Sequence, residues 1–505
     1  MSVTLASFIL YTLLIVGVGL YASKFARDSD EDYFLAGRTL GPWLAALSSC
    51  ASGSSGWVTI GLVGLGFSSG AMAYWLIPGV LLGIAFNWFV LAGPMRRRAE
   101  ELNALTIPDL MALHFRERVP VLRILCVIVI LSSMLMYVAA QLAAAGEAFV
   151  AGFDDVKGWI GVVLGGVIVL AYTVLGGFRA ACWTDFVQAI LMLVAVLGTP
   201  LILLYEIGGF AGVSQSLQQA DTNLLTLMPD ATGLALVGFL LGSAALGVNF
   251  GYPGQPHVLV RFMAMRDERE ARKAGAISIT WVILTYLGAV STGLLVRAMA
   301  EGGTDWATTL LNPQEGDSEV ALVVAAMNLL PGVLSGLVLA AILAAIASTA
   351  DSQLVVAASS VANDLYARLV ERSGKRAHTI INRAVLFTLG VGAVLMVLNE
   401  NISVYNYVLT YGWAMLGASF APQLALMLLW RRASYAGAVA GMLTGFSLVL
   451  IWPPLNQWLI DEQIITVTFY NLTVASLCAL AVNVAFSLVM PTPTRPDRIL
   501  DGPDS

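Results

Sequence analysis

The chain has 505 residues, of which 58% are hydrophobic and only 11% are charged. Soluble domains carry about 25% charged residues, so this composition excludes a water-soluble globule and predicts that most of the chain lies within a bilayer. A formal net charge of −6 without a basic stripe also argues against a nucleic-acid partner.

Apolar runs recur along nearly the whole chain. A helix that crosses a bilayer needs roughly 20 predominantly apolar residues. By that measure we predict about thirteen spans, at 4–22, 41–66, 72–94, 124–150, 158–177, 183–206, 232–258, 274–298, 332–362, 384–399, 404–429, 435–453 and 466–490. The first run has no basic residue before it and no small-residue cleavage site, so we expect a span and not a removable signal peptide.

Basic residues are distributed very unevenly over the predicted loops. Of the 26 Lys and Arg residues, 24 fall on one side, and the other side holds only Lys157 and Arg297. Loops rich in Lys and Arg stay in the cytoplasm. We therefore predict an N-terminus outside and a cytoplasmic C-terminus in the cell (inner) membrane. Arg261 is counted here as a loop residue of the basic side.

Two predicted spans contain runs that break helices. The second span is rich in serine and glycine between Leu47 and Trp57, and the seventh has glycines and two prolines between Gly247 and Pro256. Irregular backbone inside a membrane persists only where protein buries it or where it lines a wet cavity. Packing faces of small residues explain either run alone. Their matched positions, five spans apart, instead favour the central binding site of a transporter built from inverted repeats.

Three carboxylates fall inside the predicted spans: Glu147, Asp185 and Asp351. A charged residue at the centre of a membrane helix costs roughly 2.5–3.5 kcal/mol, so such residues mark ion pathways or proton relays. Glu147 lies close enough to the outer end of its span to reach the interface. Asp185 lies near the inner start of its span, where a helix cap is the competing explanation. Asp351 is the deepest and is the favoured functional acid.

The residues around Asp351 predict a cation site. Ala345, Ser348 and Thr349 stand at i, i+3 and i+4, so they share one helix face. A carbonyl at Ala345 and hydroxyls at the other two offer oxygen ligands to a small alkali cation, completed by carbonyls from the broken second span. Asp351 and Ser352 lie one turn further toward the cytoplasm and suit a second ion or proton station. The alternative is that the hydroxyls bond back to their own helix.

Other chemistries find no support in the sequence. The four cysteines are scattered in apolar runs and the three histidines are not clustered, which predicts neither a disulfide framework nor a metal site. The chain has no G-x-x-x-x-G-K-[ST] run, so energy for uphill transport has to come from an ion gradient. We predict no enzyme activity, no cofactor beyond the coupling ion and no obligate protein partner.

Eight short stretches, in order along the chain, match the motifs of a known family. They are 32–42 (DYFLAGRTLGP), 55–57 (SGW), 105–109 (LTIPD), 176–178 (GGF), 183–185 (WTD), 254–257 (GQPH), 261–264 (RFMA) and 348–349 (ST). Together they resemble the sodium:solute symporter family, and within it the branch that carries proline. The resemblance implies an all-α membrane protein of thirteen spans with a LeuT-type five-plus-five inverted repeat. Its parts would be a first helix (1–30), a first repeat (31–210), a second repeat (211–430), two peripheral helices (431–490) and a cytoplasmic tail (491–505).

The resemblance also implies binding residues. The sodium site would use Ala51, Ser54, Ser55, Gly56, Ala345, Ser348 and Thr349. Asp185 matches the acid that the family places on the ion exit path. Together with Asp351 and Ser352 it would form the second ion or proton path. For the solute, Tyr137, Tyr252 and Pro256 match positions of the family's proline pocket, and to these we add Gly53, Trp57, Gln141 and Asn249 as predicted pocket residues.

Two positions depart from the proline-carrying branch. Gly53 stands where that branch has an aspartate, and Val248 stands where it has a tryptophan. Loss of the aspartate removes a formal charge from the surroundings of the cation. Sodium remains the expected ion, and a proton carried by Asp351 and Asp185 is the alternative.

The sequence thus predicts a secondary active transporter that imports a small organic solute with sodium by alternating access. Proline or a related amino acid is the expected solute, and another small carboxylate is the alternative. A transporter-like membrane sensor is a hypothesis from a different class, and it usually requires an attached signalling domain. After Met490 only about fifteen polar residues follow.

Overall fold

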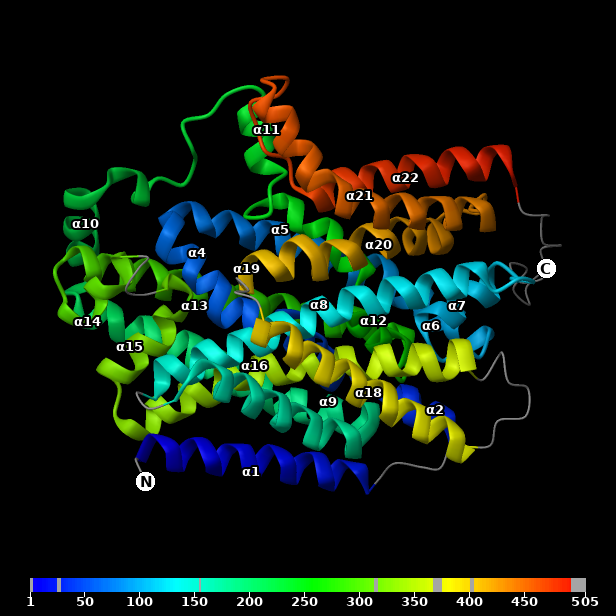
Figure 1. Ribbon diagram of the computed structural model, residues 1–505, viewed down its shortest axis with the longest axis horizontal. Helices are drawn as coiled ribbons and strands as arrows, with labels where there is room; N and C mark the ends of the chain where they lie inside the picture. The colour runs from blue at the N-terminus through cyan, green and yellow to red at the C-terminus, as the bar shows by residue number, and fades with distance from the viewer. Residues whose placement is uncertain are drawn as a thin grey trace.

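The computed structural model describes residues 3–24, 29–153, 156–312, 317–366, 375–399 and 404–491. In this part of the chain the regular elements are helices, and most run along one axis (Figure 1). They are α1 (Val3–Ser23), α2 (Asp30–Leu35), α3 (Pro42–Gly56), α4 (Leu62–Ser69), α5 (Leu76–Phe86), α6 (Ala92–Glu101), α7 (Ile107–His114), α8 (Val121–Gly152), α9 (Gly158–Glu206), α10 (Gly209–Ala220), α11 (Leu234–Leu240), α12 (Pro256–Met263), α13 (Ala271–Glu301), α14 (Asp305–Thr308), α15 (Ala321–Leu329), α16 (Gly332–Ser359), α18 (Lys375–Asn399), α19 (Val404–Tyr407), α20 (Ala414–Leu429), α21 (Tyr435–Asp461) and α22 (Asn471–Val489). The prediction of an all-α protein is confirmed.

Ten helical segments of the described chain are long and apolar enough to cross a membrane. This finding confirms a protein with many membrane-spanning helices, whereas the count of thirteen stays a prediction. The numbers differ in part because Pro42–Glu101 is a single run of 60 residues that joins two predicted spans. A straight helix of that length would measure about 90 Å, three times the hydrocarbon core, so the chain has to turn within it. Gly70, with a φ of +61°, starts the 3-10 segment Gly70–Trp75 inside the run.

Both predicted helix breaks are present. α3 is interrupted at Ser55, whose φ of 54° and ψ of 179° are not helical, and a π-helical turn over Trp57–Gly61 leads into α4. Between α11 and α12 the chain follows the 3-10 segment Leu246–Gly254. α12 continues to Met263, so the seventh span extends five residues beyond its predicted end at 258.

The fifth and sixth predicted spans correspond to the two arms of α9, a run of 49 residues. A kink at Gly177, where φ is +61° and ψ is −172°, separates the two helical arms. Glycine reaches this backbone conformation without steric cost. Asp185 lies eight residues after the kink and therefore inside the helix. The explanation of Asp185 as a helix cap is wrong.

α16 lies in the middle of the bundle. In the segment Gly332–Tyr366, which contains α16, 83% of the most apolar 18-residue stretch is buried, the largest share among the candidate spans of the described chain. α16 packs against α1, α3, α8 and α9, whereas α21 and α22 pack on each other at the edge (Figure 1). The break in α3 is thereby brought against α16, the helix that carries the predicted cation ligands.

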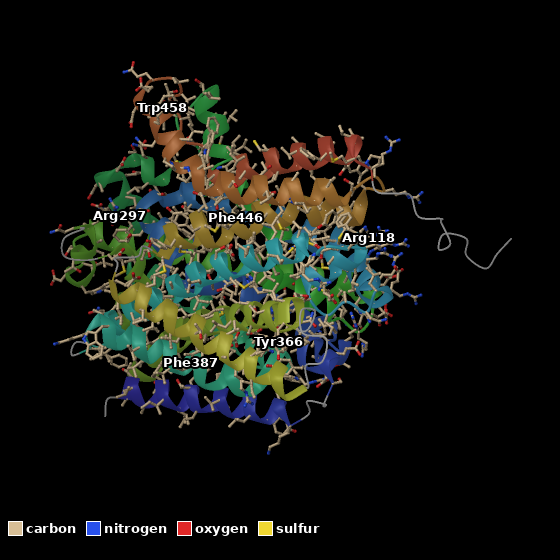
Figure 2. The ribbon with its side chains drawn as sticks, turned by 45° about the vertical axis from the view of Figure 1, so that its right-hand side comes forward. Arg118, Arg297, Tyr366, Phe387, Phe446 and Trp458 are labelled. Carbon is tan, nitrogen blue, oxygen red and sulfur yellow. The ribbon has the colours of Figure 1, made fainter. Side chains whose placement is uncertain are left out.

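Basic residues that were predicted to lie on opposite sides of the membrane mark the two ends of the bundle. Figure 2 shows Arg118 at one end, which we call the basic end, and Arg297 at the other. Near the basic end, the guanidinium of Arg38 donates to the carbonyl of Met263 at 3.0 Å and thereby holds the end of α12. Burial lowers the pKa of this guanidinium, and its hydrogen bond with Glu31 opposes that shift.

Several arginines that were counted in loops are buried. Arg96 and Arg123 are 5% and 6% exposed, and Arg261 is completely buried. The positive-inside rule uses position along the chain and carries no information about where a long side chain points. Arg261 belongs to α12 and reaches into the bundle, so its assignment to a basic loop is wrong.

Candidate functional site

Five oxygen atoms gather where the break in α3 meets α16. The hydroxyl of Ser348 donates to the carbonyls of Ala51 and Ala345, at 3.2 and 3.1 Å. The hydroxyl of Thr349 donates to the carbonyls of Ser52 and Ala51, at 3.0 and 3.4 Å. Both hydroxyl residues are completely buried. We call these five oxygens, two from hydroxyls and three from carbonyls, the oxygen cluster.

The oxygen cluster has the chemistry of an alkali-cation site. Carbonyls freed at broken membrane helices are typical sodium ligands in secondary transporters. Ser348 does bond back to its own helix, as the simpler explanation predicts, yet both hydroxyls also reach across to α3. The cluster contains no carboxylate. The end of the helix just before the break carries about half a negative charge, which partly balances a cation.

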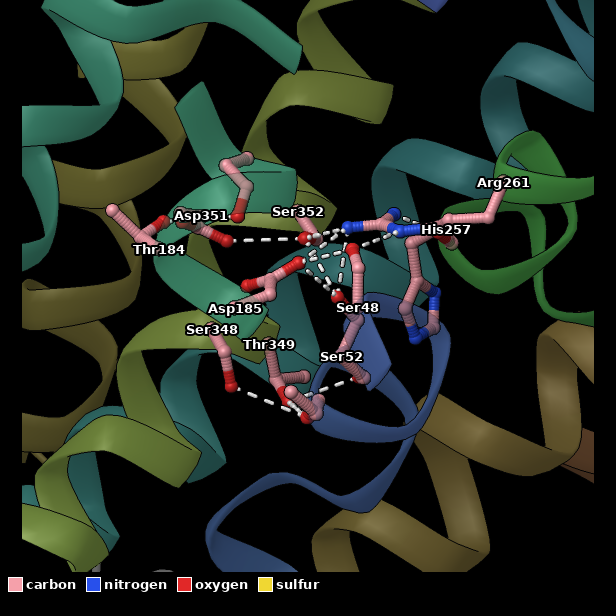
Figure 3. A network of polar contacts seen from close by, with 12 residues as sticks. Ser48, Ser52, Thr184, Asp185, His257, Arg261, Ser348, Thr349, Asp351 and Ser352 are labelled. Atoms are coloured by element: carbon pink, nitrogen blue, oxygen red, sulfur yellow. Dashed lines mark hydrogen bonds and ion pairs between the residues drawn. The ribbon is translucent and has the colours of Figure 1, made fainter. Parts of the chain in front are cut away.

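A second polar group lies one turn further along α16, toward the basic end (Figure 3). Asp185 on α9 accepts hydrogen bonds from the hydroxyls of Ser48 and Ser52 on α3, at 2.6 and 3.1 Å. The same carboxylate forms an ion pair with Arg261 of α12 at 2.9 Å. Arg261 also donates to the hydroxyl of Ser352 on α16 at 2.6 Å. These five residues, each at most 1% exposed, form what we call the arginine cluster.

Asp351 adjoins the arginine cluster. The hydroxyl of Ser352 donates to its Oδ1 at 3.0 Å (Figure 3). The structure therefore brings together Asp185, Asp351 and Ser352, the three residues predicted for a second ion or proton path. Ser352 thus connects the two buried carboxylates through the guanidinium of Arg261, because it accepts from Arg261 and donates to Asp351. Glu147 lies on α8 and takes part in neither cluster.

α8 contacts the other side of the break in α3. The backbone N–H of Gly56 donates to Oε1 of Gln141 at 2.7 Å, and the hydroxyl of Tyr137 donates to Ser55 at 3.5 Å. Among the residues that the structure describes, Nε2 of Gln141 has no hydrogen-bond partner. A backbone N–H at the start of a helical segment and a side-chain amide are suitable donors for a carboxylate. The contacts of Ser55 and Gly56 thus group them with predicted solute residues, whereas the prediction placed them with the cation.

A small cavity lies beside the break, between α3, α5, α12 and α13. Gly53, Ser54 and Tyr252 line it, together with Tyr286. The hydroxyls of the two tyrosines are 3.3 Å apart, within hydrogen-bonding distance. Trp57 packs its ring against Tyr286 with 6.0 Å between the ring centroids. Ser54, predicted as a cation ligand, therefore lies with the predicted solute residues Gly53, Trp57 and Tyr252.

Two predicted solute residues lie elsewhere. The side-chain amide of Asn249 donates to the carbonyl of Leu246 in its own 3-10 segment. Pro256 starts α12 and lines a separate cavity with Thr106. The described contacts do not group these two residues with Gln141.

A third network is buried near the basic end. Arg123 on α8 forms ion pairs with Asp109 and Asp364, at 2.8 and 3.0 Å. Thr106 donates to the same Asp364 carboxylate at 2.8 Å. The network ties α7 and α8 to the π-helical segment Ser360–Tyr366 that follows α16. We assign it a structural role.

Sequence reasoning missed Ser48, Ser52 and Arg261. The two serines stand at i and i+4 in the serine-rich second span, a spacing that places them on one helix face and that was available as a signal. Arg261 stands among apolar residues in a helix whose eight residues are all buried. An arginine inside an apolar run was the second signal. It was missed because Arg261 lies close to the predicted end of the span and was assigned to the following loop.

Comparison with known proteins gives consistent relatives. A model described as the sodium:solute symporter family matches residues 33–445. The chain is 34% identical to the osmoregulated proline transporter OpuE of Bacillus subtilis (strain 168), covering 88% of this chain and 87% of that protein. It is 35% identical to the high-affinity proline transporter PutP of the same organism, with 86% and 89% covered. It is 32% identical to the sodium/proline symporter of Escherichia coli (strain K12), with 89% and 87% covered.

Solved structures share the fold. A Na+-coupled sialic acid symporter in a substrate-bound outward-open state matches with a TM-score of 0.79 at 18% identity, covering 98% of this chain and 99% of that one. MhsT in complex with L-phenylalanine matches with a TM-score of 0.53 at 14% identity, with 88% and 98% covered. These likenesses confirm the predicted LeuT-type membrane fold. The relatives named here are transporters and not enzymes, as predicted.

Proposed function

Since this chain belongs to the sodium:solute symporter family, we propose that it imports proline or a related amino acid, driven by the inward movement of sodium. The relatives described as proline transporters, more than 30% identical over most of the chain, support this solute. The oxygen cluster between α3 and α16 supports sodium as the ion. That cluster is the observation that carries the proposal, because it joins the broken helix to the most buried one.

We place the protein in the cell (inner) membrane with its N-terminus outside and its basic end in the cytoplasm. The uneven distribution of Lys and Arg supports this orientation. Sodium and solute would then enter from the end that carries Arg297 and leave at the end that carries Arg118.

The break in α3 offers a physical route for coupling ion to solute. The carbonyl of Ala51, before the break, belongs to the oxygen cluster, and the N–H of Gly56, after it, points at α8. Sodium bound to the oxygen cluster fixes the backbone of the break. That fixed backbone holds Gln141 through the bond from the Gly56 N–H, so that Nε2 of Gln141 is positioned to donate to a solute carboxylate. Preorganisation of this kind raises affinity because less ordering remains to be done on binding.

The release of sodium would follow the second ion path. Asp185, Asp351 and Ser352 lie one turn closer to the basic end than Ser348, and their oxygens offer the next set of ligands. A cation that leaves the oxygen cluster toward the cytoplasm meets these oxygens next. Conformational change then separates α3 from α16 and opens the path.

Uptake into proteoliposomes tests this function. The purified protein is reconstituted, and uptake of radiolabelled proline is measured with an inward Na+ gradient and an inward proton gradient imposed separately. We expect uphill uptake with Na+ and only background uptake with the proton gradient or with K+ in place of Na+. Uptake driven by protons alone would replace sodium as the coupling ion. No uptake of any amino or carboxylic acid under either gradient would refute the proposal.

A further inference from the structure

The guanidinium of Arg261 is held by three helices besides its own. Its Nε donates to Ser48 on α3 at 3.1 Å, and one Nη donates to Ser52 of the same helix at 2.8 Å. That Nη also donates to Asp185 on α9 at 2.9 Å and to Ser352 on α16 at 2.6 Å. A buried charge is tolerated only with this degree of pairing. Removing the guanidinium would therefore loosen contacts among four helices.

These contacts cross the boundary between two groups of helices. Arg261, Ser48 and Ser52 belong to α12 and α3, the two helices next to the breaks. Asp185 and Ser352 belong to α9 and α16. Transporters of this type expose their site alternately by moving one group of helices against the other. The ion pair between Arg261 and Asp185 therefore has to change when the protein changes state.

Sodium and Arg261 act on the same pair of helices. The carbonyl of Ser52 accepts from Thr349 in the oxygen cluster, and its hydroxyl contacts Arg261 in the arginine cluster. Ser352 lies one turn from Ser348 on α16 (Figure 3). A cation at either level therefore pulls α3 toward α16. The difference is that sodium leaves in each cycle, whereas the guanidinium stays attached to the chain.

We infer that Arg261 is a built-in cation that holds α3 and α12 against α9 and α16 when sodium is absent, so that the empty carrier can close and return. The inference rests on the proposed function, because only a symporter that releases sodium and solute inside has an empty return step. Arg261 contacts Asp185 and Ser352 of the second ion path but none of the oxygens of the oxygen cluster and neither Gly56 nor Gln141, so it acts as a positioning residue. Its loss should slow the return of the empty carrier and spare the steps in which sodium is bound.

Two transport modes separate these steps. Net uptake of proline under a sodium gradient requires the empty carrier to return. Exchange of internal for external proline, with saturating sodium and proline on both sides, uses only the loaded carrier. We expect Arg261→Gln to lower net uptake at least tenfold and to leave exchange within twofold of the unmodified protein. Arg261→Lys keeps the positive charge and should restore at least half of the net uptake.

Two further variants keep the test decisive. Ser48→Ala removes the hydroxyl that accepts from Nε of Arg261 and keeps the ion pair between Arg261 and Asp185, so it should lower net uptake with exchange preserved. Arg266→Gln is the matched control, because Arg266 is an exposed arginine that pairs with Glu270 outside both clusters. It should leave both modes unchanged.

Three results would overturn the inference. They are a parallel fall of net uptake and exchange in Ser48→Ala, unchanged net uptake in Arg261→Gln, and a failure of Arg261→Lys to exceed Arg261→Gln. Each leaves the proposed function intact as long as the unmodified protein takes up proline with sodium. A lack of sodium-driven uptake by the unmodified protein would instead be a failure of the proposed function.

Discussion

Replacing Thr349 by valine tests the oxygen cluster directly. The substitution keeps the branched shape of the side chain and exchanges the hydroxyl for a methyl group. One of five oxygens is lost, and the carbonyls of Ser52 and Ala51, which accept from Thr349 at 3.0 and 3.4 Å, then face a methyl group. The perturbation is therefore confined to the ligand set and to two carbonyls that belong to it.

The size of the effect follows from the ligand that is lost. A polar contact to a charged group contributes about 1.5–3 kcal/mol. Each 1.4 kcal/mol changes an equilibrium constant about tenfold. The sodium concentration that gives half-maximal proline uptake should therefore rise about 10- to 150-fold in Thr349→Val. Maximal uptake at saturating sodium should change much less, because the solute contacts on α8 remain.

The assay is proline uptake as a function of external sodium in proteoliposomes. Thr349→Ser keeps the hydroxyl and should stay within about threefold of the unmodified protein. Thr292→Val on α13 is the matched control, because that hydroxyl is also completely buried but donates to the carbonyl of Gly288 in its own helix, at 2.8 Å. An unchanged sodium requirement in Thr349→Val, or an equal shift in Thr292→Val, would refute the oxygen cluster as the sodium site.

Three further substitutions test other contacts. Gln141→Leu removes a donor and the partner of a backbone N–H, so the KM for proline should rise about tenfold or more at saturating sodium; a KM within twofold of the unmodified protein would remove Gln141 from the solute site. Asp351→Asn removes one of the two carboxylates on the ion path and should impair sodium coupling, and unchanged ion dependence of uptake would exclude it from the mechanism. Arg123→Met removes the arginine that forms ion pairs with the buried carboxylates of Asp109 and Asp364 and should destabilise the protein by about 3–5 kcal/mol, visible as a lower melting temperature in detergent. The exposed Arg97→Met serves as its control, and similar melting temperatures for the two variants would show that the buried network adds little stability.

Local patterns in the sequence predicted the elements whose cause is local. The serine and glycine run in the second span predicted the break that the structure has at Ser55. The spacing of Ser348 and Thr349 from Ala345, at i+3 and i+4, predicted that the three residues share a helix face, and both hydroxyls reach α3. The depth of Asp351 in its span predicted a buried acid, and it is completely buried. Helix periodicity and the length of an apolar run are sufficient for such statements.

Contacts between distant segments were harder to predict. Arg261 was counted in a loop because it lies three positions beyond the predicted end of the seventh span at 258, whereas its long side chain extends to Asp185, 76 residues away in sequence. The Gly56 N–H was expected near the cation, yet its partner is Gln141 on α8. Which of two neighbouring sites a residue joins depends on how the helices pack, and no local pattern contains that information.

The chain around Gly177 shows the same limit from another direction. Residues 178–182 were predicted as a loop between two spans, and the structure separates the two helical arms of α9 at a single glycine. Hydropathy reports where the chain is apolar and does not report how few residues a break between two helices needs. Asp185 consequently lies eight residues into the second arm and not at its beginning.

Ser52 gives the two clusters a thermodynamic link. Its carbonyl and its hydroxyl belong to the same residue, and they serve the oxygen cluster and the arginine cluster respectively. If engagement of the guanidinium changes the affinity for sodium by some factor, then sodium binding changes the stability of the engaged guanidinium by the same factor. Sodium affinity in this protein is therefore a property of both clusters together. A substitution at the arginine cluster that never touches the ion should appear in a sodium titration.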